Sequence, residues 1–219
     1  MQVKICGLKR REDAIAAAAL GADALGFVMG GLVLPYEIEP AAQHVREMIK
    51  SVGGKAETYL VTHLKEPKDI LALAEYIGCS GIQVSEDIGV AGLKSVREGT
   101  SRKLIKTIVV GKGAATKLRG YEPFCDFILL DTRHKGYTGG TGEVNDWSLC
   151  KKLVQLSKKP VYLAGGLNPS NLSTAINEVK PAGVDVSTGV STFSKSNPRK
   201  DAKDHAKIRK FIEVAKVWV

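Results

Sequence analysis

Short apolar runs that alternate with longer amphipathic stretches constrain the fold of this 219-residue chain more than any other feature. Most of these runs are nearly continuous in apolar residues, which is typical of parallel strands buried on both faces. The predicted strands are Gln2–Ile5, Ala24–Val28, Thr58–Val61, Gly81–Val84, Lys103–Val109, Phe127–Leu130, Val161–Ala164 and Val184–Ser187. The predicted helices are Arg11–Leu20, Pro40–Lys50, Pro67–Ile77, Val90–Glu98, Trp147–Ser157, Asn168–Val179 and Arg199–Val217, with a short connection around Lys112–Gly120.

Eight strands in 219 residues leave about 27 residues per unit, which is enough for a minimal repeat of strand, loop and helix. We therefore predict an α/β protein, a single (β/α)8 TIM barrel that spans residues 1–219 as one domain. A doubly wound open sheet is the alternative, but no Gly-x-Gly-x-x-Gly follows the first strand. No linker, charge block or low-complexity run divides the chain.

Several residues mark where the predicted helices begin. Pro40 and Pro67 fit the first turns of their helices, because a proline there loses no intrahelical hydrogen bond. Asp146 is predicted to cap the helix that starts at Trp147, and Asn168-Pro169 has the pattern of an N-cap followed by the first helical residue.

The cysteine spacing and the amino-terminal sequence predict a cytoplasmic location. The four cysteines are far apart, at positions 6, 79, 125 and 150, without a Cys-x-x-Cys pair, which indicates reduced thiols rather than a disulfide scaffold. The chain becomes charged before a signal-peptide apolar region can form. The apolar stretch Ala14–Pro35 contains Asp23 and four glycines, so it fits a helix and a strand better than a membrane span.

The net charge of +9 points to an anionic partner, but it does not distinguish RNA, a membrane surface and a phosphorylated metabolite. More than half of the surplus, +5, lies in residues 195–210. Helical spacing places those charges on the solvated face of the last helix, and no aromatic residues alternate with them as a base-stacking surface requires. A nucleic-acid-binding barrel is thus the weaker alternative, and we expect neither a nucleic acid nor a membrane as partner.

Glycine-rich turns follow the last two predicted strands. Gly165 and Gly166 follow the seventh strand, and Ser187-Thr188-Gly189 follow the eighth. Such turns expose backbone N–H groups to an anion, and the corresponding loops are the usual phosphate site of these barrels. One Gly-Gly pair alone would indicate an ordinary tight turn, but the two turns together predict a phosphate site.

Cys6 and Asp131 are the candidate base and acid, because chemistry in such a barrel lies at the carboxyl ends of the strands. Cys6 follows the first strand beside Lys4, a position that favours a thiolate, although a small buried cysteine without a chemical role is the alternative. Asp131 ends an apolar run, where burial would keep its carboxyl protonated. Two titratable groups whose pKa values are shifted in opposite directions can face each other across one substrate.

The segments KICGLKRREDAIAAAALGADALGFV, LLDT with GGTGEVNDW, LAGGLNPSNLSTAI and GVDVSTGV resemble the signature segments of the phosphoribosylanthranilate isomerase family of tryptophan biosynthesis. They occur in the family's order and cover roughly half of the chain. The resemblance implies a (β/α)8 barrel that needs neither metal nor cofactor. It also implies an enzyme that performs the Amadori rearrangement of N-(5-phosphoribosyl)anthranilate, in which the anthranilate nitrogen stabilises the Schiff-base intermediate.

The resemblance also implies roles for particular residues. Cys6 would be the general base that removes the sugar C2 proton, Asp131 the general acid that protonates the furanose oxygen, and Asp185 the residue that orients the sugar hydroxyls. Apart from the resemblance, Lys4 and Arg133 are also expected to bind the substrate. The residues expected around the phosphate are Gly142, Gly165, Gly166, Ser187, Thr188 and Gly189. The expected partner is a small phosphosugar, and the expected assembly is a monomer or a homodimer.

The middle of the chain departs from the family pattern. The loop after the second strand carries no Lys or Arg between Met29 and Pro40, where the family usually has an Arg that binds the anthranilate carboxylate. Gln83-Val84-Ser85 replaces the usual Gln-Leu-His, and Val61-Thr62-His63 replaces Phe-Val-Asn. Either Arg133, His134 or Lys135 supplies the missing charge, or the chain is a paralogue that isomerises or binds another phosphosugar. The four histidines lack metal-ligand spacing, which disfavours a metal-dependent pentose-phosphate epimerase on the same fold.

Overall fold

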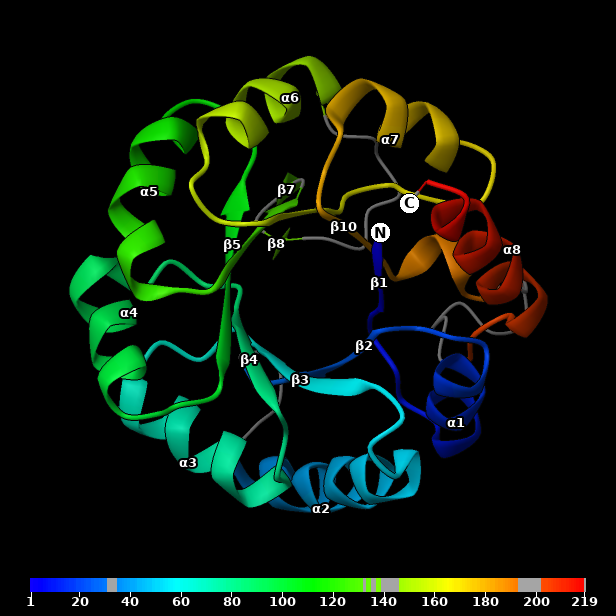
Figure 1. The fold of residues 1–219 in the computed structure, drawn as a ribbon. Helices are drawn as coiled ribbons and strands as arrows, with labels where there is room; N and C mark the ends of the chain where they lie inside the picture. The colour runs from blue at the N-terminus through cyan, green and yellow to red at the C-terminus, as the bar shows by residue number, and fades with distance from the viewer. Residues whose placement is uncertain (31–34, 132, 135–136, 139–145, 193–201, 219) are drawn as a thin grey trace.

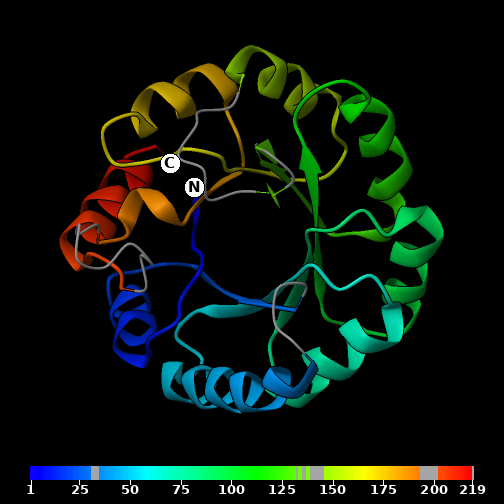
Figure 2. The same ribbon diagram turned by 180° about the vertical axis from the view of Figure 1, so that it is seen from behind.

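The computed structural model describes residues 1–30, 35–131, 133–134, 137–138, 146–192 and 202–218. Eight of the described strands close into a parallel barrel in the order β1-β10-β9-β6-β5-β4-β3-β2. Helices form a ring outside the strands, and the elements follow one another around this ring in chain order (Figures 1 and 2). The predicted (β/α)8 barrel is confirmed. In the described part of the chain, no helix has the length and apolar character needed to cross a membrane.

The strand predictions agree with the structure to within one residue at each end. The barrel strands are β1 (Gln2–Ile5), β2 (Ala24–Met29), β3 (Glu57–Thr62), β4 (Gly81–Val84), β5 (Lys103–Val109), β6 (Phe127–Asp131), β9 (Val161–Leu163) and β10 (Gly183–Val186). The short strands β7 (Arg133–His134) and β8 (Tyr137–Thr138) pair antiparallel after β6. The helices are α1 (Arg11–Ala19), α2 (Pro35–Val52), α3 (Pro67–Ile77), α4 (Gly89–Glu98), α5 (Ala114–Tyr121), α6 (Trp147–Leu156), α7 (Leu172–Val179) and α8 (His205–Lys216), with 3₁₀ turns η1 (Glu122–Phe124) and η2 (Thr188–Val190).

Side chains alternate along each strand between the barrel interior and the helical layer. The larger apolar cluster packs between strands and helices, and it includes Val184 and Val186 of β10. A smaller cluster fills the barrel itself and comprises Ala24, Tyr59, Ile105, Leu129, Tyr162 and Ala164. Because Leu129 faces inward, Asp131 two residues later faces the same interior at the carboxyl end of β6.

The helix starts predicted at Pro67 and Asp146 are confirmed, and the one predicted at Pro40 is wrong. Pro67 is the first residue of α3, and the Asp146 side chain accepts a hydrogen bond of 3.0 Å from the Leu149 N–H. The predicted start at Pro40 is wrong, since α2 begins at another proline, Pro35, and Pro40 lies inside the helix. Pro40 lies in the second turn of α2, and the helix there lacks the one intrahelical hydrogen bond that a backbone N–H at this position would donate.

The last two helices also begin later than predicted. The Asn168 side chain accepts hydrogen bonds from the N–H groups of Ser170 and Asn171 and closes a turn, so α7 begins only at Leu172. The predicted start at Arg199 is likewise wrong: residues 199–201 lie outside the described ranges, and α8 begins at His205. Asp204 caps α8 by accepting the N–H groups of Ala206 and Lys207.

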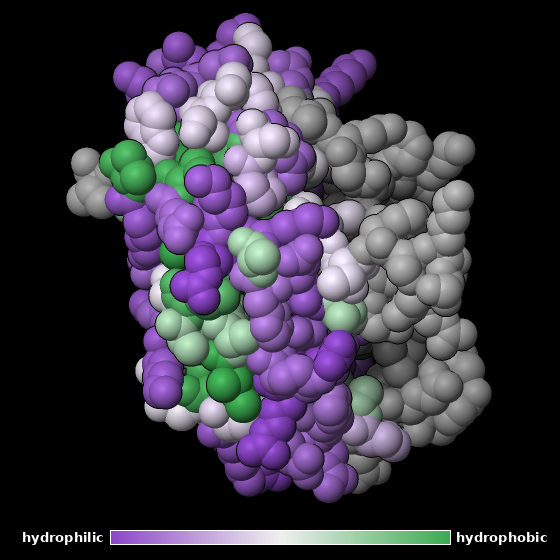
Figure 3. Space-filling view, turned by 90° about the vertical axis from the view of Figure 1, so that its right-hand side faces the viewer, coloured by the Kyte–Doolittle hydropathy of each residue, from purple (hydrophilic) through white to green (hydrophobic). Residues whose placement is uncertain are grey.

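The basic residues of α8 follow the prediction only in part. Lys207, Arg209 and Lys210 are exposed, as expected. The face over α1 and α8, at the right of Figure 1, is largely hydrophilic with scattered hydrophobic patches (Figure 3). Lys203 contradicts the prediction of a solvated face, because it precedes the helix and is only 5% exposed. Its position outside α8 means that helical spacing did not apply to it.

Candidate active site

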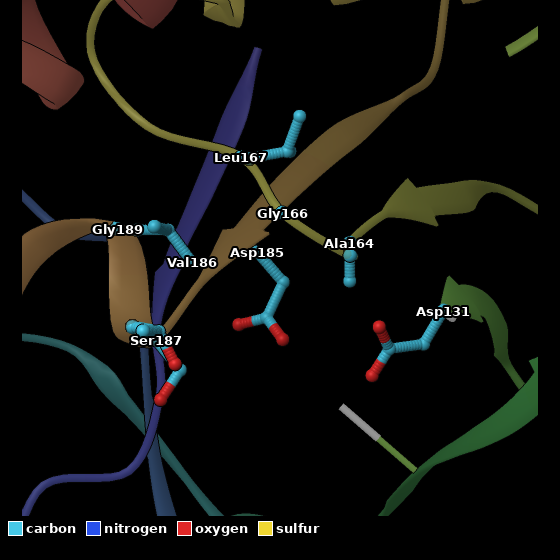
Figure 4. Close-up of a pocket in the computed structure, with 10 residues that line it drawn as sticks. Asp131, Ala164, Gly166, Leu167, Asp185, Val186, Ser187 and Gly189 are labelled. Atoms are coloured by element: carbon cyan, nitrogen blue, oxygen red, sulfur yellow. The ribbon is translucent and has the colours of Figure 1, made fainter. Parts of the chain in front are cut away.

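A pocket of about 350 Å³, partly open to solvent, lies where β6, β9 and β10 end. It is lined by Asp131, Ala164, Gly165, Gly166, Leu167, Asp185, Val186, Ser187, Thr188 and Gly189. Asp131 comes from the end of β6 and Asp185 from β10, and both carboxylates point into the space between them (Figure 4). The structure therefore brings together most of the residues predicted for the site.

The phosphate half of the predicted site consists of the loops after β9 and β10. Gly165 and Gly166 have φ angles of 83° and 69°, a left-handed conformation that a residue with a Cβ rarely adopts. Gly189, in η2, packs directly against the first loop: a Cβ at this position would lie 2.9 Å from the Leu167 carbonyl carbon. The two loops thus touch through their backbones and present a small-residue surface to the pocket.

Lys4 and Asp185 form a buried ion pair beside this surface. They lie opposite each other on the paired strands β1 and β10, and Lys4 Nζ is 3.0 Å from Asp185 Oδ1. The Lys4 side chain is 0% exposed and that of Asp185 is 8% exposed. Burial, the largest single influence, lowers the pKa of Lys4, but the Asp185 carboxylate and Cys6 together outweigh it, so the pKa of Lys4 is raised. The pair therefore keeps an ammonium group inside the barrel.

The Cys6 thiol lies next to this ammonium group. Cys6 directly follows β1, its N–H donates to the Val186 carbonyl at 2.8 Å, and it is 7% exposed. The two groups meet over Gly26, where a Cβ would be 2.8 Å from Cys6 Sγ and 3.0 Å from Lys4 Nζ. Burial raises the pKa of Cys6, and the nearby Lys4 lowers it by less. The prediction that this position favours a thiolate is therefore wrong, because loss of solvation exceeds the attraction to Lys4.

The remaining predicted residues are not placed by the structure. Gly142 and Lys135 lie outside the described residues. Arg133 and His134 are described as the backbone of β7, and their side chains lie outside the described part. The expected charge near the aromatic end of the substrate and the protonation state of Asp131 stay predictions.

Lys203 is the main site residue that the sequence analysis missed. Its Nζ donates hydrogen bonds to the Ser187 carbonyl at 3.0 Å and to Ser191 Oγ at 3.3 Å, so it holds the loop after β10 from behind. Burial lowers the pKa of Lys203 to about 8, and the Cys6 thiolate opposes this shift. The signal that could have revealed it is Asp204, a strong N-cap residue that places Lys203 before the helix rather than on its face.

Polar side chains also gather inside the barrel on the β3–β5 side. Gln83 is 4% exposed and its Nε2 donates to Thr107 Oγ1 at 3.2 Å, with Ser85 Oγ nearby at 3.4 Å. His63 is half-buried, and burial lowers its pKa. Val28 at the end of β2 is 49% exposed. Across the described residues, no group of three His, Cys, Asp or Glu side chains is placed to hold a metal ion.

Known proteins match this chain over the whole length of the barrel. The family model described as N-(5'phosphoribosyl)anthranilate (PRA) isomerase matches residues 3–214. The N-(5'-phosphoribosyl)anthranilate isomerase 2 of Methanosarcina mazei is 34% identical over 221 residues, which cover 99% of this chain and 94% of that relative. The crystal structure of phosphoribosyl anthranilate isomerase from Thermotoga maritima superimposes with a TM-score of 0.83 at 31% identity, covering 99% of both chains. Another solved isomerase, in complex with reduced 1-(o-carboxyphenylamino)-1-deoxyribulose 5-phosphate, superimposes with a TM-score of 0.80 at 29% identity and covers 99% of both chains.

Proposed function

The chain belongs to the N-(5'-phosphoribosyl)anthranilate isomerase family, and from that premise we propose how its residues carry out the isomerisation. The enzyme rearranges the aminoaldose N-(5'-phosphoribosyl)anthranilate into the corresponding carboxyphenylamino-deoxyribulose phosphate, a step of tryptophan biosynthesis. The observation that carries this conclusion is the family match over residues 3–214 together with the pocket at the carboxyl ends of β6, β9 and β10. The paralogue with another substrate, left open by the sequence, loses support from a match of this extent.

We propose that the phosphate of the substrate binds between the loops after β9 and β10. Gly165 and Gly166 on one side, and Ser187, Thr188 and Gly189 on the other, bring backbone close to the pocket without intervening bulky side chains. Backbone N–H groups at such turns favour an anion, and Lys203 adds a buried positive charge behind Ser187. Gly142, which lies outside the described residues, is also expected to contact the phosphate.

Asp131 is the proposed general acid. Its carboxyl group faces the pocket across from Asp185, and it would deliver a proton to the furanose ring oxygen. As the C1–O bond breaks, the anthranilate nitrogen forms a double bond to C1, which produces the open-chain Schiff base. Asp185, held by Lys4, would accept hydrogen bonds from the sugar hydroxyls and orient the chain.

Cys6 is the proposed general base. Its thiolate would remove the C2 proton, and the electrons of that C–H bond would move into the C1–C2 bond and neutralise the iminium nitrogen. The resulting enaminol becomes the ketone when C1 gains a proton and the C2 hydroxyl loses one, so substrate and product remain isomers. Lys4 favours the thiolate form of Cys6, whereas burial opposes it. A well-placed proton transfer of this kind contributes ~10²–10⁴-fold to the rate.

The aromatic end of the substrate would lie toward β2–β4, opposite the phosphate loops. Val28 is an exposed apolar side chain at that end of the barrel, which suits an aromatic ring. The sequence offers no Lys or Arg between Met29 and Pro40, so we propose that Arg133 pairs with the anthranilate carboxylate. Strand β7, which carries Arg133, lies within the ring of helices in both views along the barrel (Figures 1 and 2).

Complementation of a tryptophan auxotroph that lacks this isomerase tests the function as a whole. We expect growth with the wild-type chain, and a soluble, folded protein that fails to restore growth would favour the paralogue. Purified Asp131→Asn and Cys6→Ser variants test the catalytic pair. Each should lose most turnover and still bind inorganic phosphate, and full activity of either variant would refute that residue's role.

We infer a cytoplasmic location for the enzyme. All four cysteines are free and buried, as expected in a reducing compartment. The substrate is a soluble phosphosugar, and the chain would act on it as a monomer or a homodimer. Light scattering of the purified protein would distinguish the two assemblies.

A further inference from the structure

Within the described part of the chain, the buried Lys203 ammonium has no carboxylate among its hydrogen-bond partners. It is 5% exposed, and its Nζ contacts the Ser187 carbonyl at 3.0 Å, Ser191 Oγ at 3.3 Å and Ser187 Oγ at 3.5 Å. All three are neutral oxygens. Burying an ammonium group costs free energy that neutral hydrogen bonds offset only in part. An anion that forms or binds beside the buried Lys203 ammonium therefore stabilises the charged lysine and is stabilised by it in turn.

The backbone of the Lys203 segment is also fixed in place. The Lys203 N–H donates to Asp13 Oδ2 at 3.0 Å, and Asp13 is 2% exposed in α1. Ser191 and Lys203 pair as an isolated antiparallel bridge, which joins the segment to the chain beyond η2. The backbone of Lys203 is thus held from two sides, and its side chain extends from this fixed point into a buried position.

The Lys203 ammonium lies close to Gly7, the residue that follows Cys6. Ser187 Oγ, which receives the Lys203 contact, packs over Gly7: a Cβ on Gly7 would lie 2.7 Å from Ser187 Oγ and 3.6 Å from Lys203 Nζ. The Lys4 ammonium therefore lies beside the thiol over Gly26, and the Lys203 ammonium lies beside Gly7, the residue that follows Cys6; both act electrostatically on the thiol.

On this geometry we propose that Lys203 is a positioning residue of the isomerase, which holds Ser187 against Gly7 and supplies the second positive charge that favours the Cys6 thiolate. The inference rests on the proposed role of Cys6 as the base. The charged groups that act on this pair are Lys4, Asp185, Asp13 and Lys9. Burial and Asp185 raise the pKa of Cys6, whereas Lys4 and Lys203 lower it.

A direct titration of Cys6 tests the proposal without depending on turnover. Thiolate absorbance at 240 nm is recorded against pH for the full-length enzyme, and the same titration of a Cys6→Ser partner of each variant is subtracted to remove the other cysteines and tyrosines. Lys203→Gln retains a hydrogen-bond donor and loses the charge. We expect it to raise the pKa of Cys6 by about 1 unit. The pH profile of kcat/KM should move to higher pH by the same amount.

Lys106→Met is the matched control. Lys106 is another buried lysine, 2% exposed, and burial lowers its pKa to about 8 as well. Its Nζ contacts the carbonyls of Val84 and Glu86, away from Cys6. We expect this variant to leave the Cys6 titration unchanged, and Lys203→Arg, which retains the charge, to lie closer to wild type than Lys203→Gln does.

The outcomes separate the proposal from the function on which it rests. An unchanged pKa of Cys6 in folded Lys203→Gln, or an equal shift in Lys106→Met, would overturn the proposal. Should Lys203→Gln fail to fold, Lys203→Met and Lys203→Arg give the same comparison of charge removed and charge kept. If Cys6→Ser is fully active while the thiol pKa still responds to Lys203, the base assignment fails and the electrostatic link between the two residues stands.

Discussion

Replacing Gly189 by alanine should disrupt the phosphate site through a backbone collision. The added Cβ would lie 2.9 Å from both the Leu167 carbonyl carbon and Asn168 Cβ, and closer still to the Leu167 oxygen. Carbon atoms in packed proteins rest at about 3.5–4.0 Å. The loops after β9 and β10 must therefore move apart by about 1 Å, because a backbone carbonyl cannot rotate out of the way as a flexible side chain can.

A separation of that size has a predictable cost. Misplacing a binding group by about 1 Å can reduce the rate by ~10²-fold, and overpacking typically costs about 1–3 kcal/mol of stability. We expect Gly189→Ala to reduce kcat/KM for N-(5'-phosphoribosyl)anthranilate by about 10²-fold. Much of this loss should appear in KM, since the phosphate lies away from the bonds that react. Steady-state kinetics, calorimetric titration with inorganic phosphate and thermal unfolding measure the three effects.

Gly120→Ala is the matched control for this change. Gly120 lies in α5 away from the pocket, and its Cβ would come within 3.1 Å of one methyl group, Cγ2 of Val90, which is 44% exposed and free to move. The control should therefore keep wild-type kinetics and phosphate binding. If Gly189→Ala also keeps kcat/KM within about threefold of wild type and binds phosphate normally, the loops are not packed as described and the phosphate assignment loses its geometric basis.

Three further predictions concern the charged groups of the site. Lys4→Met leaves Asp185 buried without its partner and should destabilise the protein by about 3–5 kcal/mol in urea unfolding. Adding Asp185→Asn should recover part of that loss, and strictly additive losses would argue against the ion pair. Burial raises the pKa of Cys6, and a base must be deprotonated, so kcat/KM should keep rising about tenfold per pH unit through neutral pH and into the alkaline range; a plateau below neutrality would contradict Cys6 as the base. Arg133→Ala should raise KM strongly with little change in kcat, and an unchanged KM would exclude the proposed carboxylate contact.

The barrel could be predicted from the sequence because each of its strands is marked by a short run of neighbouring apolar residues. Buried parallel strands require apolar runs, and these runs end where glycine or charge appears, so the ends of strands such as β1 (Gln2–Ile5) are predicted correctly. Helix starts were harder to predict, since two candidate residues often compete. Helix α2 starts at Pro35 rather than at Pro40, and α7 starts at Leu172 rather than directly after Asn168. The first residue of each helix depends on which turn the tertiary packing extends.

Which residues meet in the pocket could be predicted from the sequence, but their electrostatics could not. Asp131 and Asp185 meet in one pocket because the barrel topology brings strand ends together, and topology was predictable. The direction of the Cys6 pKa shift was not, because it depends on how completely Gly26 and its neighbours exclude water from the thiol. The prediction that Lys203 lies on a solvated helix face was wrong for a related reason. Whether a lysine is solvated depends on the fold around it and not on the charge of its segment.

The net charge of +9 therefore says little about how this enzyme recognises its anionic substrate. Exposed cations on α8 contribute to that total, but water and salt screen them and they lie outside the barrel. Inside the barrel, Lys4 is already matched by Asp185, while Lys203, behind the loop after β10, has neutral oxygens as its hydrogen-bond partners among the described residues. A charge in a poorly solvated position acts on its neighbours more strongly than several exposed ones. If the proposed roles of the loop after β10 and of Cys6 hold, Lys203 acts on both, which gives phosphate binding and proton abstraction a common electrostatic origin.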